Sequence, residues 1–483
     1  MTVKSLTART LKQHGAALAA GEYSAEELTR AYLLEIEKKD GELGAYLTVL
    51  PEKALETARR IDRRRAAGEP LTPLAGIPFA LKDNLCTRGV RTTCGSKILE
   101  NYIPPYTATA VRRLEDAGAV LLGKCNMDEF GMGSTTEHSA FCPTRNPLSP
   151  DRVPGGSSGG CAAAVAAGEA AFALGSDTGG SVRQPAAFCG IVGLKPTWGA
   201  VSRYGLTAFA SSLDQIGPMT RTVEDNAAVF DAIAGPDEKD ATALPGNAVA
   251  AAAEIGKEVR GLRVGMIREL FSARISPEVR DAAINAAKAY ERMGASVDEV
   301  SLPSLSYALA AYYIISSAEA SSNLARFDGV RYGRRAEQYD NITELYTKSR
   351  SEGFGAEVRR RIMLGTFVLS SGYYDAYYKK ALSARALICA ESDRALQSFD
   401  ALLAPAAPTA AVPFGYAASP VEMYQGDLCT VPANIAGLPA LSLPCGETAE
   451  GLPVGMQLIG KARSEPLLYR MGAAFECERG RAE

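Results

Sequence analysis

Residues 155–185 read GGSSGGCAAAVAAGEAAFALGSDTGGSVRQP, and this stretch decides the fold class. Two glycine-rich turns, at 155–160 and 176–182, lie at the two ends of an alanine-rich helical segment and an apolar strand. One helix-plus-strand excursion of this kind returns the chain to the sheet edge from which it left. We therefore predict that Ser157 and Ser181 present their hydroxyls to one point.

The same alternation of helix and strand continues on both sides of this stretch. A helix is expected over Thr107–Ala117, followed by a buried strand at Ala119–Leu122. Further on, the pattern predicts a strand at Leu262–Ile267, a helix at Pro277–Met293 and a strand at Ala295–Val300. Repeated units of this type predict an α/β fold with a large mixed, mainly parallel central sheet that is covered by helices.

The segments around this core are also interpretable. The first seventy residues are expected to be helical, with a capping box at Ser24–Glu27 that opens a helix reaching about Lys39. We predict a single domain over 1–483, with N-terminal helices at about 1–70 and a catalytic core at about 71–470. The alanine-rich stretch Pro245–Gly256 is interpreted as a surface linker or insertion. The tyrosine-rich stretch Gly372–Tyr378 is expected in a buried helix or groove wall.

The composition excludes several classes of protein. With 52 basic and 55 acidic residues the formal net charge is −3, so the chain has no general attraction for nucleic acid. The basic run Ala58–Arg65 falls in a helical pattern that begins at Pro51, which favours a solvated helix face. None of the ten cysteines forms a CxxC pair, the N-terminus has no apolar signal region, and no apolar stretch reaches transmembrane length. These features predict a cytoplasmic protein that is not bound to a membrane.

Three familiar motifs fail on inspection. Gly118–Lys124 resembles a phosphate-binding loop, but Cys125 replaces the magnesium-binding Ser or Thr and the middle of the motif is strand-like. Gly155–Gly159 matches the G-x-S-x-G nucleophile elbow, which requires a histidine later in the chain. The two histidines, His14 and His138, both precede it, and neither a zinc hydrolase nor another histidine-based scheme fits this count.

A lysine supplies the base that histidine cannot provide. Lys82 follows the apolar residues 78–81 and is expected at the buried end of a strand, where desolvation disfavours the ammonium form. Neutral Lys82 can then take a proton from Ser181 through Ser157 as a relay. The glycines of the second turn allow backbone N–H groups to converge as an oxyanion hole, with Thr178, Gly179, Gly180 and Ser181 as the donors.

At this point the sequence resembles the amidase signature family. The Ser–cis-Ser–Lys triad of that family corresponds to Ser181, Ser157 and Lys82, and the match extends through 193–199 and 212–218. The resemblance implies the amidase-signature fold and hydrolysis of a carboxamide.

Segments outside the signature narrow the resemblance to one group within the family. Residues 126–137, 353–365 and 423–434 resemble the A-type subunits of glutamyl-tRNA(Gln) amidotransferases. The resemblance implies a glutaminase that works in a heterotrimer with B-type and C-type subunits. It also implies that ammonia passes to a partner, where ATP and Mg²⁺ activate the glutamate on misacylated tRNA. No metal or organic cofactor is then expected in this chain.

The same group implies a binding site for free glutamine. Arg360 would hold the α-carboxylate and Asp427 the α-ammonium group, with a contact from Tyr312 or Tyr313 and another from Ser134. Because residues 359–361 are all arginine, the arginine that binds the substrate could be shifted by one position. Because a free amino acid carries both charges, a specific pocket needs one fixed cation and one fixed anion.

Two other functions compete with this interpretation. A standalone amidase that acts on an aryl or aliphatic amide would have a greasy pocket without the charged pair and would need no partner. A catalytically silent scaffold protein would have a broken triad, whereas Lys82, Ser157 and Ser181 are all present.

Overall fold

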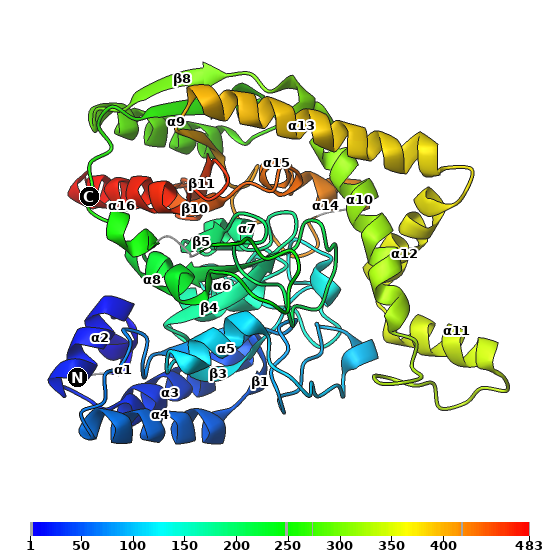
Figure 1. Ribbon diagram of the computed structural model, residues 1–483, viewed down its shortest axis with the longest axis horizontal. Coiled ribbons are helices and arrows are strands. Elements are labelled where there is room, and N and C mark those ends of the chain that lie inside the picture. Colours follow the sequence, from blue (N-terminus) through cyan, green and yellow to red (C-terminus); the bar gives the residue numbers. More distant parts are fainter. Residues whose placement is uncertain (1–2, 247–249, 273, 417–418, 483) are drawn as a thin grey trace.

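A computed structural model describes residues 3–246, 250–272, 274–416 and 419–482 (Figure 1). Its centre is one eleven-stranded sheet, counted over these residues, with the strand order β1-β3-β2-β4-β6-β5-β10-β11-β9-β7-β8. The strands are β1 (Tyr46–Val49), β2 (Pro78–Lys82), β3 (Val120–Cys125), β4 (Phe172–Asp177), β5 (Val192–Lys195), β6 (Gln215–Thr220), β7 (Arg263–Ile267), β8 (Ser296–Val300), β9 (Ala401–Pro405), β10 (Ala440–Glu447) and β11 (Pro453–Gly460).

The prediction of a large mixed sheet in an α/β fold is confirmed, but its mainly parallel character is wrong. Of the ten neighbouring strand pairs in the described chain, four are parallel and six are antiparallel. The strand–helix–strand units produce the parallel pairs among β2, β3 and β4 and among β7, β8 and β9. The strands at the centre of the sheet pair antiparallel. A short turn such as the one joining β10 to β11 can only connect antiparallel strands.

Helices surround the sheet along the whole chain. They are α1 (Val3–Thr7), α2 (Leu11–Ala20), α3 (Ala25–Leu43), α4 (Pro51–Ala66), α5 (Thr109–Asp116), α6 (Gly159–Ala166), α7 (Arg183–Phe188), α8 (Val223–Ile233), α9 (Pro277–Arg292), α10 (Ala308–Asn323), α11 (Ile342–Gly353), α12 (Ala356–Leu369), α13 (Lys379–Ser398), α14 (Pro420–Gln425), α15 (Val431–Ile435) and α16 (Glu465–Ala482). Helices α10 to α13 form a lobe to the right of the sheet in Figure 1. The helices and strands predicted around 107–122 and 262–300 are all present, with ends shifted by a few residues.

The predicted capping box is present at the start of α3. The Ser24 hydroxyl accepts the N–H of Glu27 at 3.0 Å, and the Glu27 carboxylate accepts the N–H of Ser24 at 2.8 Å. The helix ends at Gly44, whose φ of 64° is the left-handed conformation that glycine adopts easily. The first seventy residues are not wholly helical, because β1 follows and pairs with the edge of β3.

Three further expectations can be compared with the structure. The arginines of the basic run lie on α4, where Arg59, Arg60 and Arg63 are exposed, as predicted. The motif at Gly118–Lys124 enters strand β3, which confirms that it is no phosphate loop. The expectation for the tyrosine-rich segment is wrong, because 374–378 forms a π-helical turn and Tyr373, Tyr374 and Tyr377 are exposed. Part of the expected linker, 247–249, lies outside the described residues.

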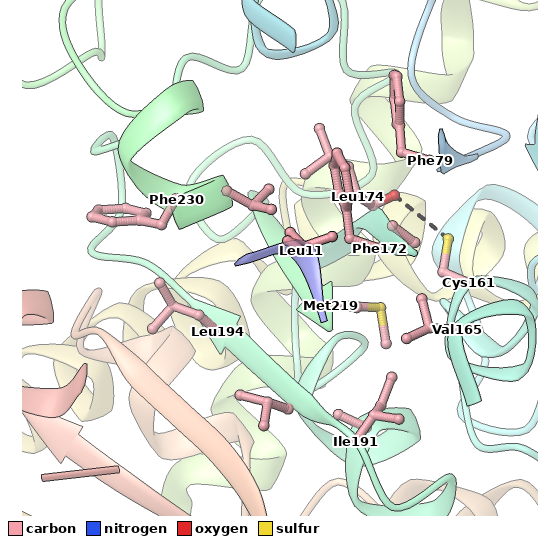
Figure 2. Close-up of a cluster of buried hydrophobic side chains, with 14 of the residues drawn as sticks. Leu11, Phe79, Cys161, Val165, Phe172, Leu174, Ile191, Leu194, Met219 and Phe230 are labelled. Atoms are coloured by element: carbon pink, nitrogen blue, oxygen red, sulfur yellow. Dashed lines mark hydrogen bonds between the residues drawn. The ribbon is translucent and has the colours of Figure 1, made fainter. Parts of the chain in front are cut away.

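The hydrophobic core fixes the frame on which the glycine-rich loops rest. Phe79 of β2 and Phe172 of β4 stack with their ring centroids 5.2 Å apart (Figure 2). Cys161 of α6 packs against β4, and its thiol approaches the carbonyl oxygen of Leu174 at 3.5 Å. Helix α6 is therefore held directly behind the parallel strands β2 and β4, and the loop at its N-terminal end lies at their carboxyl ends.

The helices range in length from five residues in α1 to twenty in α13. Within the described ranges, none of them combines the length with the apolar character that crossing a bilayer requires.

Candidate active site

Lys82 is the last residue of β2 and is completely buried. Its Nζ lies 2.7 Å from the Oγ of Ser157, 2.8 Å from the Oγ of Ser158 and 3.2 Å from the carbonyl oxygen of Ser176. All three partners are neutral oxygens, and none of the described carboxylates forms an ion pair with the amine. Burial lowers the pKa of Lys82 from 10.5 to about 8. The predicted buried lysine with a weakened ammonium form is therefore present, and it can work as a base near neutral pH.

The loop that carries Ser157 is tightly packed against its neighbours. The peptide bond between Gly156 and Ser157 is cis, and the N–H of Gly156 donates to the side-chain oxygen of Gln184 at 3.0 Å. A Cβ at position 156 would lie 2.6 Å from the backbone nitrogen of Thr135, so only glycine fits. Ser158 was not expected to contact Lys82, but its hydroxyl also lies 3.1 Å from the carbonyl oxygen of Ser176. Ser157 is thus the serine whose hydroxyl remains available for proton transfer.

Ser181 lies on the second glycine-rich loop, directly after β4. Its carbonyl oxygen accepts the N–H of Ser158 at 3.1 Å, which joins the two loops and places Ser181 beside the Lys82–Ser157 pair. The N–H of Gly180 is already committed, since it donates to the Asp177 carboxylate at 2.9 Å. Of the amides that the sequence suggested for the oxyanion hole, Gly180 is therefore occupied in this structure. The N–H groups of Thr178, Gly179 and Ser181 remain as donors.

Sequence reasoning missed the charged pair that shapes this loop. Arg183 binds Asp177 in a bidentate manner, with two N–O distances of 3.1 Å, and both side chains are fully buried. Asn434 donates to the same carboxylate at 2.8 Å. Burial raises the pKa of Asp177, but Arg183 and these hydrogen bonds outweigh it and hold the pKa at about 2. The signal was available in the sequence, because Asp177 and Arg183 directly flank the glycine-rich turn.

A second carboxylate lies in the predicted substrate region. Asp427 is buried, and its two oxygens accept hydrogen bonds from the hydroxyls of Ser134 at 2.7 Å and Tyr313 at 2.5 Å. Burial raises the pKa of Asp427 to about 6, although both hydrogen bonds and the nearby Arg361 work against this rise. The carboxylate is therefore charged at neutral pH, and its two hydrogen-bond donors are both neutral.

Two arginines of the triplet have different surroundings in the structure. Arg360 is about half exposed and pairs with Glu357, whereas the Arg361 side chain is only 3% exposed. The Arg361 guanidinium lies 4.5 Å from the ring centroid of Tyr313, the residue that binds Asp427. Its Nη1 has no hydrogen-bond partner in the described part of the chain. The Arg361 charge thus acts on Asp427 and lowers its pKa, whereas Arg360 lines a cavity.

The tyrosines and Ser134 connect this charged region to the catalytic loops. A Cβ added to Gly179 would lie 2.5 Å from the Tyr312 hydroxyl, so that ring covers the oxyanion loop. Tyr313 and Ser134 both bind Asp427, and Thr430 donates to the carbonyl oxygen of Gly179 at 2.6 Å. The residues that the sequence predicted for catalysis and for substrate binding therefore lie close together, and Arg360 lines a cavity beside them.

Two cavities lie beside these residues. They measure about 460 and 450 Å³, which is the range of small-molecule sites, and both are lined by Thr135, Glu137 and Met423. The first also reaches Ser134 and Gln184, which lie next to Asp427 and Gly156.

The loop at 134–138 is shaped by a residue that the sequence pattern did not single out. Asp128 is fully buried, and its carboxylate accepts the backbone N–H groups of Thr136 at 2.9 Å and His138 at 3.1 Å. His138 is thus held through its backbone, in line with its interpretation as an ordinary loop residue. Among the described residues, no group of three or more His, Cys, Asp or Glu side chains is arranged to hold a metal ion.

Comparisons with known proteins agree with this geometry. The model of the amidase family matches residues 27–469. The A-type chain of the glutamyl-tRNA(Gln) amidotransferase of Moorella thermoacetica is 59% identical over 456 residues, which cover 94% of this chain and 93% of that protein. The crystal structure of the corresponding A-type chain from Thermotoga maritima has a TM-score of 0.82 at 43% identity and covers 98% of this chain and 95% of that chain.

A relative that is named for a different activity has the same fold. The structure of native peptide amidase from Stenotrophomonas maltophilia has a TM-score of 0.84 at 34% identity, covering 98% of this chain and 97% of that chain. The fold is therefore shared between proteins with different names, and function has to be argued from the site. The extent of the family match and the arrangement of Lys82, Ser157 and Ser181 together show that this chain belongs to the amidase family.

Proposed function

We propose that this chain is the glutamine-hydrolysing component, of the A type, in a cytoplasmic glutamyl-tRNA(Gln) amidotransferase. The observation that carries the proposal is the pair of buried charges beside the catalytic loops: the Asp427 carboxylate and the Arg361 guanidinium with its free Nη1. Free glutamine offers an α-ammonium group to the first and an α-carboxylate to the second. Its side-chain amide is then directed towards Ser181.

The geometry supports acyl transfer by the following route. The Ser181 oxygen attacks the side-chain carbonyl carbon of glutamine, while its proton passes to Ser157 and the Ser157 proton passes to neutral Lys82. Backbone N–H groups of the loop after β4 stabilise the negative charge that develops on the carbonyl oxygen. The C–N bond breaks as the proton returns to nitrogen through Ser157, and ammonia leaves. Water then hydrolyses the glutamyl ester by the same relay, which yields glutamate and free Ser181.

The wider assembly is part of the same proposal. The relatives from Moorella thermoacetica and Thermotoga maritima are components of amidotransferases, so partner subunits are implied. We assign B-type and C-type partners and expect ammonia to reach the partner that holds the misacylated tRNA. ATP and Mg²⁺ are placed in that partner, where they activate the glutamate. The chain itself then needs neither a metal nor an organic cofactor.

The main rival is a standalone amidase, because a peptide amidase shares this fold. An enzyme for a neutral amide would gain nothing from a buried carboxylate held by two neutral donors and a buried guanidinium with a free Nη1, and burying these groups would be costly. The rival scaffold function is disfavoured because Lys82, Ser157 and Ser158 are within hydrogen-bonding distance. The charged pair therefore favours a zwitterionic substrate.

The proposal is tested in the complex reconstituted with B-type and C-type subunits. Arg361→Gln and Asp427→Asn should each lower kcat/KM for glutamine by about thirty-fold to several thousand-fold, since each leaves one substrate charge desolvated and unpaired. Ser181→Ala should abolish glutamine hydrolysis. Amidation of tRNA with added ammonia should survive in all three variants, because ammonia bypasses this pocket. Arg360→Gln should change kcat/KM by less than about threefold, since its side chain is about half exposed.

Two results would contradict the proposal. If Arg361→Gln and Asp427→Asn keep normal glutamine kinetics, the donor site lies elsewhere and a standalone amidase becomes the better explanation. If both lose the ammonia-dependent reaction in parallel with the glutamine reaction, the two residues serve the fold.

A further inference from the structure

A continuous set of contacts joins the two charges of the pocket. Asp427 accepts the hydroxyl of Tyr313, whose ring stacks on Tyr424 with a centroid distance of 3.9 Å. The Tyr424 hydroxyl donates to Oε1 of Glu357 at 2.9 Å, and the Nε of Arg361 donates to the same oxygen at 2.6 Å. The Arg361 guanidinium lies 4.5 and 4.6 Å from the two ring centroids. Glu357 therefore holds one side of the guanidinium, while Nη1 has no partner among the described residues.

This arrangement solves a problem that any pocket for a zwitterion faces. A cation and an anion that lie close together in a buried pocket attract each other strongly, because little water separates them. If the side chains met, they would occupy each other and block the substrate. Arg361 does act electrostatically on Asp427, yet its ion pair is with Glu357. Glu357 thus competes with Asp427 for the guanidinium.

The position of Glu357 suits this role. It lies in the first turn of α12, one helical turn before Arg361, and its side chain is 6% exposed. The spacing of four residues places both side chains on one face of the helix, and the Tyr424 hydroxyl fixes the carboxylate from the side of α14. Because the carboxylate oxygen is shared by the Nε of Arg361 and Tyr424, neither can move without breaking a hydrogen bond.

We propose that Glu357 is a positioning residue for the glutamine site, which holds Arg361 away from Asp427 so that the free Nη1 can donate to the substrate α-carboxylate. This inference rests on the proposed function and deepens it. The carboxylate is already bound by Arg361 and Tyr424. The carboxylate acts through Arg361, and it therefore changes the affinity for glutamine.

The test is Glu357→Gln in the reconstituted complex. The amide keeps the shape of the side chain but loses the charge that attracts Arg361. KM for glutamine should rise by roughly ten- to a hundred-fold, with kcat within about threefold of the unmodified chain, since one charge-assisted contact is weakened. Amidation with added ammonia should be unchanged. Asp375→Asn is the matched control, because Asp375 and Lys379 form an ion pair of the same spacing on an exposed surface. It should leave KM unaltered.

A second, milder variant distinguishes a local effect on Arg361 from a loss of folding. Tyr424→Phe keeps the ring stack and removes only the hydroxyl that fixes Glu357, so KM should rise by about three- to tenfold, as expected for one lost hydrogen bond. The effects of the two substitutions should not add in the double variant, because both act on the same carboxylate. The inference is overturned if both variants keep KM within about twofold while Arg361→Gln raises it. If Arg361→Gln also leaves KM unchanged, the proposed donor site itself fails.

Discussion

The pH dependence of glutamine hydrolysis should report the protonation of Lys82. With a pKa of about 8, roughly one tenth of Lys82 is neutral at pH 7, half at pH 8 and nine tenths at pH 9. If only the neutral amine accepts the proton that Ser181 passes through Ser157, the rate of acyl transfer should rise about tenfold between pH 7 and pH 9 and level off above that. The cause is desolvation, since Lys82 is wholly buried and its three hydrogen-bond partners are neutral oxygens.

The assay is single-turnover ammonia release by the reconstituted complex at saturating glutamine, from about pH 6 to about pH 9.5, which brackets the lysine titration. Lys82→Arg is the decisive variant, because a guanidinium keeps the charge but cannot be deprotonated. It should lose activity by at least about a thousandfold at every pH, as Lys82→Ala should, which is near the upper range for removal of a general base. A flat profile between pH 7 and pH 9, or substantial activity in the arginine variant, would refute the role of Lys82 as a base and leave it an electrostatic one.

The remaining predictions concern four other residues. Ser157→Ala should lower kcat by about a hundred- to ten-thousandfold, whereas Ser158→Ala should lower it by no more than about tenfold; equal losses would reject Ser157 as the relay to Lys82. Because Asp427 must be charged to hold an ammonium group, 1/KM for glutamine should fall as the pH drops through about 6, and Asp427→Asn should abolish this limb of the profile. Glu169 is fully buried, and neither oxygen of its carboxyl group has a hydrogen-bond partner among the described residues. Burial raises the pKa of Glu169 to about 9, so the folded state keeps a proton that the unfolded chain releases above pH 4.5. Stability should therefore fall as the pH rises from about 4.5 to 9, and Glu169→Gln should gain roughly 4 °C in Tm between pH 5 and pH 8 relative to the unmodified chain. A constant difference in scanning calorimetry would argue against this.

The candidate catalytic residues could be picked out from the sequence because their signals are local. Ser157 and Ser181 lie in glycine-rich turns, and such turns are rarely needed unless a backbone makes a close approach. Lys82 follows an apolar strand and so had to be buried where that strand ends. The small number of histidines excluded the common alternatives, and the pattern of helices and strands indicated the fold class.

Other features could not be read from local patterns. Whether two strands run parallel depends on which strands become neighbours, and β5, β6, β10 and β11 come together from distant parts of the chain. The tyrosines near 373–377 are apolar enough for a core, but helices α12 and α13 project them outwards. Hydrophobicity alone does not tell which face a segment presents.

At the substrate site, too, some residues could be selected from the sequence and others only from the tertiary structure. Three adjacent arginines are equivalent in composition, and each step along a helix rotates the side chain by about 100°. Val358, Arg361, Gly365 and Val368 share the inward face of α12, a periodicity that could have selected Arg361 in advance. The link from Arg361 through Glu357 and Tyr424 to Tyr313 and Asp427 could not be foreseen. It joins residues that are separated by up to 114 positions in the sequence, and only the packing of their segments brings these charges together.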